Sequence, residues 1–201
     1  MAEANKTRVL RELRDEASRL RQTARAVETA HVGETDWGPR EVLAHIVLWA
    51  IQATEHFRLH LPPLDYGDRQ HWGSDVIGSF NTAFVHLAGP AVNPDVASQA
   101  GWEAVASSGV VLPLPVEDTP DQHMRVDDAF NAAAVALVRN RPFDDVLHLT
   151  ERTHANLIEL LEKCPVDSYG DNSYLYRRMV LVVAHHVEHR VQLGDSVGGS
   201  N

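Results

Sequence analysis

The chain has 201 residues, enough for one domain with a sizeable core, and 44% of them are hydrophobic, which excludes a disordered protein. A formal net charge of −10 argues against nucleic-acid binding, because a surface that neutralises phosphates needs clustered Lys and Arg. The single cysteine, Cys164, excludes a disulfide within the chain and fits a reducing compartment. Because there is no signal-peptide core and no long apolar run, we expect a cytoplasmic protein that does not span a membrane.

Four long amphipathic helices are predicted, because apolar residues recur at steps of three and four along each of them. In the first helix this stripe runs from Leu10 to Val27. Pro39 suits the first turn of the second helix, and Gly194 is expected to end the last one. The predicted helices span about 5–28, 38–59, 143–163 and 173–193. They favour an all-α four-helix bundle, with residues 1–201 forming a single domain.

The segment 60–140 differs in composition from the rest of the chain. It is rich in proline and glycine, and between positions 60 and 130 it carries ten acidic residues against Arg69 and Arg125. We interpret it as an insertion of short helices and loops between the second and third core helices.

Three of the 12 histidines suggest a metal site. His185 and His189 are four residues apart and therefore lie on one face of a helix, a spacing that lets two imidazoles bind one ion. His45 lies in the second helix between apolar neighbours, where a buried imidazole needs a polar partner. A metal shared with the other two would be such a partner. A core histidine bonded to a carbonyl or carboxylate explains His45 equally well.

Two segments resemble a known family. The residues from Trp37 to Ile46 (WGPREVLAHI), followed by Trp49, resemble a motif of the DinB-like (YfiT-like) superfamily, and residues 185–193 (HHVEHRVQL) resemble its closing helix. The likeness covers the four long helices. Residues 71–81 more weakly resemble the ClbS/DfsB branch, and the N-terminal domain of mycothiol-dependent maleylpyruvate isomerases is another branch considered.

The resemblance implies an up-down-down-up bundle in which His45, His185 and His189 bind one divalent cation, and it also implies a homodimer. Three protein ligands leave a coordination position open for water or a substrate atom, as in catalytic sites. Zn²⁺ is the first choice, and Ni²⁺ or Fe²⁺ would accept the same imidazoles.

The expected function is a metal-dependent enzyme that acts on a small molecule, by hydrolysis or by transfer involving a low-molecular-weight thiol. His154, on the inner face of the third helix, and Glu188, beside the histidine pair, are the candidate catalytic residues. Each could equally be structural, His154 as a core histidine and Glu188 as a surface charge. The alternatives to an enzyme are a non-catalytic protein that binds a small molecule for self-protection, and a bundle that binds metal only adventitiously.

The remaining histidines are assigned no role. His56 is expected at the solvated end of the second helix, and His186 points about 100° away from His185, too far round to bind the same ion. The others are expected on the surface or in loops: His31, His60, His71, His86, His123 and His148.

Overall fold

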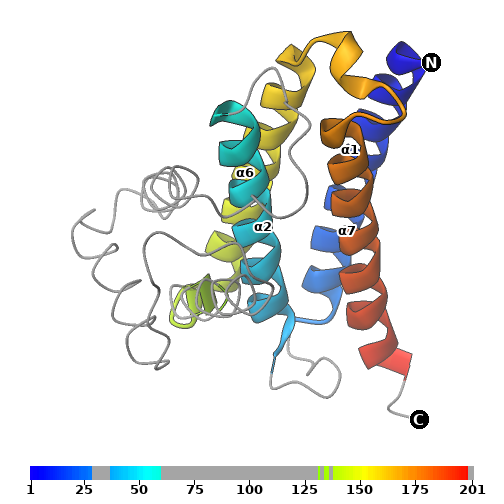
Figure 1. The fold of residues 1–201 in the computed structure, drawn as a ribbon. Coiled ribbons are helices and arrows are strands. Elements are labelled where there is room, and N and C mark those ends of the chain that lie inside the picture. Colours follow the sequence, from blue (N-terminus) through cyan, green and yellow to red (C-terminus); the bar gives the residue numbers. More distant parts are fainter. Residues whose placement is uncertain (29–36, 60–130, 132–133, 136–137, 199–201) are drawn as a thin grey trace, which may run out of the picture.

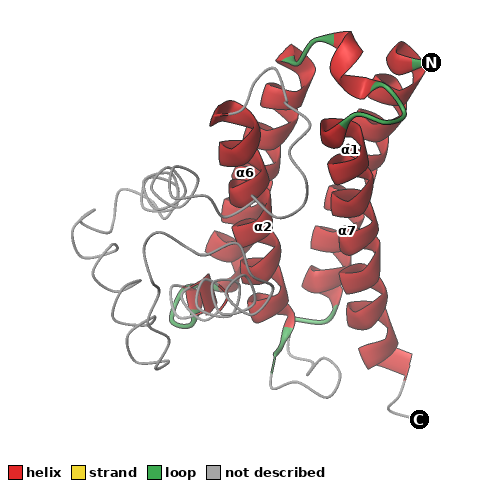
Figure 2. Cartoon of the chain, viewed as in Figure 1, coloured by secondary structure: helices red, strands yellow, loops and turns green. Residues whose placement is uncertain are grey.

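The computed structural model describes residues 1–28, 37–59, 131, 134–135 and 138–198. These residues include four long α-helices and one short 3₁₀ helix, residues 131, 134–135 and 138 are also helical, and the described part contains no strand (Figures 1 and 2). The helices are α1 (Ala2–Ala26), α2 (Pro39–Leu59), α6 (Phe143–Lys163) and α7 (Tyr174–Gly198), with the 3₁₀ helix η2 (Val166–Tyr169) before α7. The all-α prediction is confirmed for this part of the chain. Most of the insertion predicted at 60–140 lies outside the described residues.

The end of α7 differs from the prediction, because the helix continues through Gly194 to Gly198. Glycine ends a helix when it adopts a left-handed conformation, and Gly194 does not. The neighbouring Leu193 is fully buried against the core, which favours continued helix at this point. The other bounds lie close to the predicted ones, and those of α6 agree with them.

The helices are arranged in two neighbouring pairs, α1 beside α7 and α2 beside α6 (Figure 1). The two members of the first pair run in the same direction, because Arg8 lies over the ring of Tyr176 near their starts and Glu16 bonds Arg190 further along. No helix in the described part is long and apolar enough to cross a membrane.

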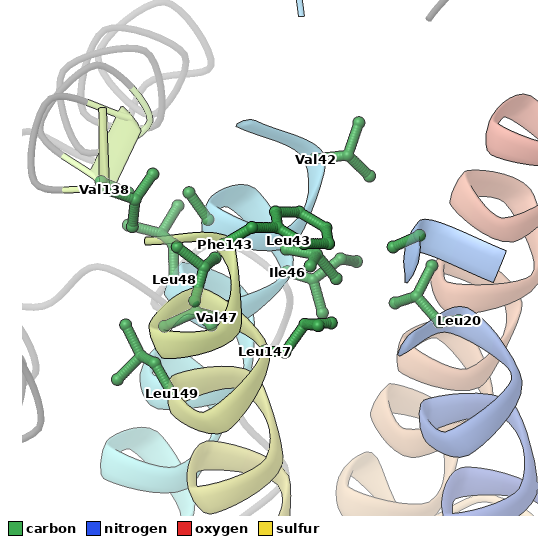
Figure 3. Close-up of a cluster of buried hydrophobic side chains, with 14 of the residues drawn as sticks. Leu20, Val42, Leu43, Ile46, Val47, Leu48, Val138, Phe143, Leu147 and Leu149 are labelled. Carbon is green, nitrogen blue, oxygen red and sulfur yellow. The ribbon is translucent and has the colours of Figure 1, made fainter. Parts of the chain in front are cut away.

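Two clusters of buried apolar side chains form most of the core between the helices. Figure 3 shows side chains of α2 and α6, among them Ile46 and Leu147, gathered between the two helices, with Leu20 of α1 facing them. The predicted stripe of α1 is buried from Leu10 to Val27. A second apolar cluster at the other end of the bundle includes Phe57, Leu157 and Tyr169.

One charged residue is nearly buried between α1 and α7. Glu16 is 7% exposed, and its two carboxylate oxygens accept hydrogen bonds from different arginines. Oε1 accepts one from Arg19 over 2.7 Å, and Oε2 accepts one from Nε of Arg190 over 2.8 Å. Burial opposes ionisation of Glu16, but the hydrogen bonds and charges of the two arginines outweigh it and lower the pKa of this carboxyl.

Candidate metal centre

The structure brings together the three histidines that the sequence singled out. His45 comes from α2, and His185 and His189 lie one turn apart on α7. The Nε2 atom of His185 lies 3.0 Å from Nε2 of His45 and 2.9 Å from Nε2 of His189. Together the three residues form a group able to hold a metal ion.

Packing shields two of the three histidines from solvent. His45 and His189 are each 9% exposed, and the neighbours of His45 on α2, Ala44 and Ile46, are buried in the core. The ring of Trp37 lies 5.4 Å from that of His45, and the ring of Trp49 lies 6.0 Å from it on the same helix. His185 is only half-buried and lines a cavity, so this packing shields His45 and His189 while leaving one side of the group accessible.

Hydrogen bonds fix the orientation of two of the three rings. His45 donates from Nδ1 to the side-chain oxygen of Asn131 over 2.7 Å, and His189 donates from Nδ1 to that of Gln192 over 2.8 Å. A neutral imidazole with its hydrogen on Nδ1 carries a lone pair on Nε2. Partners of this kind commonly orient metal-binding histidines in proteins.

The lone pairs of His45 and His189 are therefore both directed at His185, whose Nε2 can donate only one hydrogen. At least one of the two close nitrogen contacts holds no hydrogen and is repulsive unless a cation lies between the rings. A second proton on His185 would not supply this positive charge near pH 7. Burial, followed by the charges of His189 and His45, lowers the pKa of His185 to about 3. Burial also lowers the pKa of His189, against the opposing effects of Gln192 and Glu188.

A divalent metal fits these donors. Zn–N distances of about 2.0–2.1 Å place two nitrogens of a tetrahedral site ~3.3 Å apart, within a few tenths of an ångström of the separations between His185 and its two neighbours. Imidazole nitrogens suit several first-row metals, Zn²⁺, Ni²⁺ and Fe²⁺ among them. Three histidines leave at least one coordination position for another ligand.

His154 and His186 form a second, separate pair. Their Nε2 atoms lie 2.5 Å apart, and each Nδ1 donates to a backbone carbonyl, that of Thr150 for His154 and that of Val182 for His186. Burial is the main cause that lowers the pKa of His154 to about 3 and that of His186 to about 4. Each neutral ring has one N–H group, and both of these hydrogens lie in the bonds to the backbone carbonyls. The contact between the two Nε2 atoms therefore holds no hydrogen.

Neither member of this pair belongs to the three-histidine group, as expected for His186. His186 is 1% exposed, so it is a buried histidine of the bundle core. The catalytic role expected for His154 stays a prediction. So does that of Glu188, whose side chain is exposed one residue before His189.

The prediction for His56 is wrong. Its side chain is 2% exposed, and its ring lies 5.4 Å from that of Tyr174 at the start of α7. The beginning of α7 therefore covers the part of α2 that was expected to face solvent. His148 is 74% exposed, as predicted, and the other five histidines expected on the surface or in loops lie outside the described residues.

The sequence analysis missed the two amide residues that orient the ligands. Gln192 lies inside the segment 185–193 and three residues after His189, so helical spacing could have indicated it. Asn131 is 86 residues away from His45 in the chain, and no pattern in the sequence links them.

Comparisons with models of known protein families, with curated proteins and with solved structures found no match. The likeness to the DinB-like superfamily therefore rests on the sequence motifs around His45 and His185 alone.

Proposed function

We propose that the protein is a metal-dependent enzyme of the DinB-like superfamily, an up-down-down-up bundle that binds one divalent cation and acts on a small molecule. His45, His185 and His189 are the ligands. The observation that supports this most directly is the convergence of their Nε2 atoms while Asn131 and Gln192 hold hydrogens on the opposite nitrogens. In these ring orientations the Nε2 lone pairs can coordinate a cation, whereas without a cation at least one Nε2–Nε2 contact is repulsive.

Zn²⁺ is the first choice of metal. A bound Zn²⁺ supplies a Lewis acid with an open coordination position, which suits both hydrolysis and the transfer of a low-molecular-weight thiol. The protein contributes the oriented imidazole rings, with the indoles of Trp37 and Trp49 packed beside His45.

The metal site is tested by measuring bound metal and metal affinity in protein purified without a histidine tag. We expect about one metal per chain in the wild type and a loss of binding of at least ~100-fold in His45→Ala and His189→Ala, since each variant removes one of three ligands. The matched control is His148→Ala, which removes an exposed histidine of α6. Equal occupancy in all four proteins would contradict the proposal.

The reaction class is tested on the metal-loaded protein with an ester and with a simple electrophile, each with and without added thiol. Thiol-dependent loss of the electrophile supports transfer, and thiol-independent ester cleavage supports hydrolysis. Full metal occupancy with neither activity would count against an enzyme and favour a binding protein.

A further inference from the structure

A cavity of about 230 Å³ opens beside the candidate metal centre. Trp49 of α2 lines one side of it, and the α7 residues that line it are Arg178, Leu181, Val182 and His185. Because His185 belongs both to the cavity wall and to the three-histidine group, a molecule in this cavity would reach the metal centre. The volume lies below the ~300–1,000 Å³ of pockets that enclose drug-sized ligands, so the occupant is small.

Among the described residues of the cavity wall, Arg178 carries the positive charge. Its guanidinium carbon lies over the ring of Trp49, 5.9 Å from the centroid, within the range of a cation–π contact. None of the carboxylates in the described part of the chain forms a salt bridge with Arg178, whereas Glu55 pairs with Arg58 and Glu16 with Arg190. The hydrogen-bond donors of Arg178 are thus not engaged by an acidic side chain of the described helices.

The spacing along α7 relates this cation to the metal centre. Arg178 and His185 are seven residues apart, which places them on the same face of the helix and about 10 Å apart along its axis. Because both residues also line the same cavity, one ligand in it can contact both.

Apart from His185, the other described residues of the wall are apolar. The indole of Trp49 and the side chains of Leu181 and Val182 offer no charged group, and Leu181 is 55% exposed at the cavity. A wall with one cation and an apolar remainder matches a molecule with one anionic group and an apolar body. The whole chain carries a net charge of −10, so a local cation is needed to hold an anion against the general field.

We propose that the substrate is a small organic carboxylate that binds in this cavity. Its carboxylate group contacts Arg178, and its apolar body packs against Trp49 and Leu181. The opposite end of the molecule then lies at His185. This inference rests on the proposed function, because it assumes that the reaction takes place at the three-histidine group.

The test uses 3-phenylpropionate as the probe and its uncharged amide, 3-phenylpropionamide, as the comparison. Binding is followed by calorimetry and by the NMR signals of the Trp49 indole and the Arg178 Nε group. We expect the acid to bind about tenfold more weakly to Arg178→Gln than to the wild type, the loss typical of one hydrogen bond to a charged group. Arg178→Lys keeps the positive charge but not the planar guanidinium, so its affinity for the acid should lie between those of the wild type and Arg178→Gln.

The matched control is Arg177→Gln, which removes the same charge from the exposed neighbouring position and should bind the acid as the wild type does. The amide should bind more weakly than the acid, and equally to all these proteins. Equal affinity of the wild type for acid and amide, or unchanged affinity of Arg178→Gln for the acid, would overturn the inference.

Titration of the metal-free protein and of His189→Ala separates this inference from the proposed function. Arg178-dependent binding of the acid in His189→Ala supports the carboxylate site even if metal binding is lost or never occurs. Binding that disappears in His189→Ala yet persists in Arg178→Gln means that the metal centre holds the acid, and it overturns the role of Arg178. The metal content of Arg178→Gln should equal that of the wild type.

Discussion

His45 donates its Nδ1 hydrogen to the side-chain oxygen of Asn131 over 2.7 Å, which leaves Nε2 of the same ring directed at His185. Asn131 belongs to the segment interpreted from the sequence as an insertion between the core helices. At this position the segment takes part in the candidate site, because it sets which nitrogen of His45 carries the lone pair.

Replacing Asn131 should therefore weaken metal binding without removing a ligand. We expect Asn131→Leu to lower Zn²⁺ affinity by about 10- to 100-fold, the usual effect of losing a partner that orients a ligand. Asn131→Asp keeps an acceptor oxygen and should restore most of the affinity. The measurement is competition with a chromophoric chelator, and equal affinity of Asn131→Leu and the wild type would show that this hydrogen bond does not prepare the site.

Acid should destabilise the protein through His154. Its pKa is about 3 in the folded state and 6.5 ordinarily, so below pH 6.5 the unfolded chain binds a proton that the folded chain does not. The free energy of unfolding therefore falls by about 1.4 kcal/mol per pH unit below pH 6.5, or by ~2 kcal/mol at pH 5 relative to pH 7.5. Urea unfolding from pH 7.5 to 5 should show a shallower decline for His154→Gln than for the wild type.

The control for this measurement is His148→Gln, which changes an exposed histidine of the same helix and should keep the wild-type decline. An equally steep decline in His154→Gln would mean that the burial of His154 does not contribute to acid sensitivity.

Removing the charge of Glu16 should destabilise the bundle. Its carboxylate is nearly buried between α1 and α7, and the side chain of its partner Arg190 is only 29% exposed. Glu16→Gln leaves this arginine without a charged partner, so we expect a loss of about 1–3 kcal/mol in the free energy of unfolding, measured in urea. Glu159→Gln disrupts the exposed pair with Lys163 and should leave the unfolding midpoint almost unchanged. Similar losses in the two variants would contradict this difference.

Gly194→Ala should stabilise the protein. The glycine lies inside α7, its backbone is not left-handed, and a Cβ atom placed there meets nothing within 4 Å. Alanine loses less backbone entropy in a helix, so we expect a gain of about 0.5–1 kcal/mol, seen as a higher thermal midpoint. A midpoint equal to or below that of the wild type would indicate that α7 has already ended before this residue in solution.

The sequence by itself determined the features that depend on neighbours along the chain. The three- and four-residue apolar steps predicted α6 with its observed bounds, and the buried face of α1 from Leu10 to Val27. The spacing of His185 and His189 placed both rings on one face of a helix because the helix repeat is fixed at about 3.6 residues.

Only the tertiary structure decided which residues meet between helices. It paired His154 with His186, buried His56 under Tyr174, and brought Asn131 to His45. These contacts depend on the rotation, register and separation of helices that are far apart in the chain, and no local periodicity encodes those quantities. The same packing places Arg178 over Trp49 and so forms the cavity beside the three-histidine group.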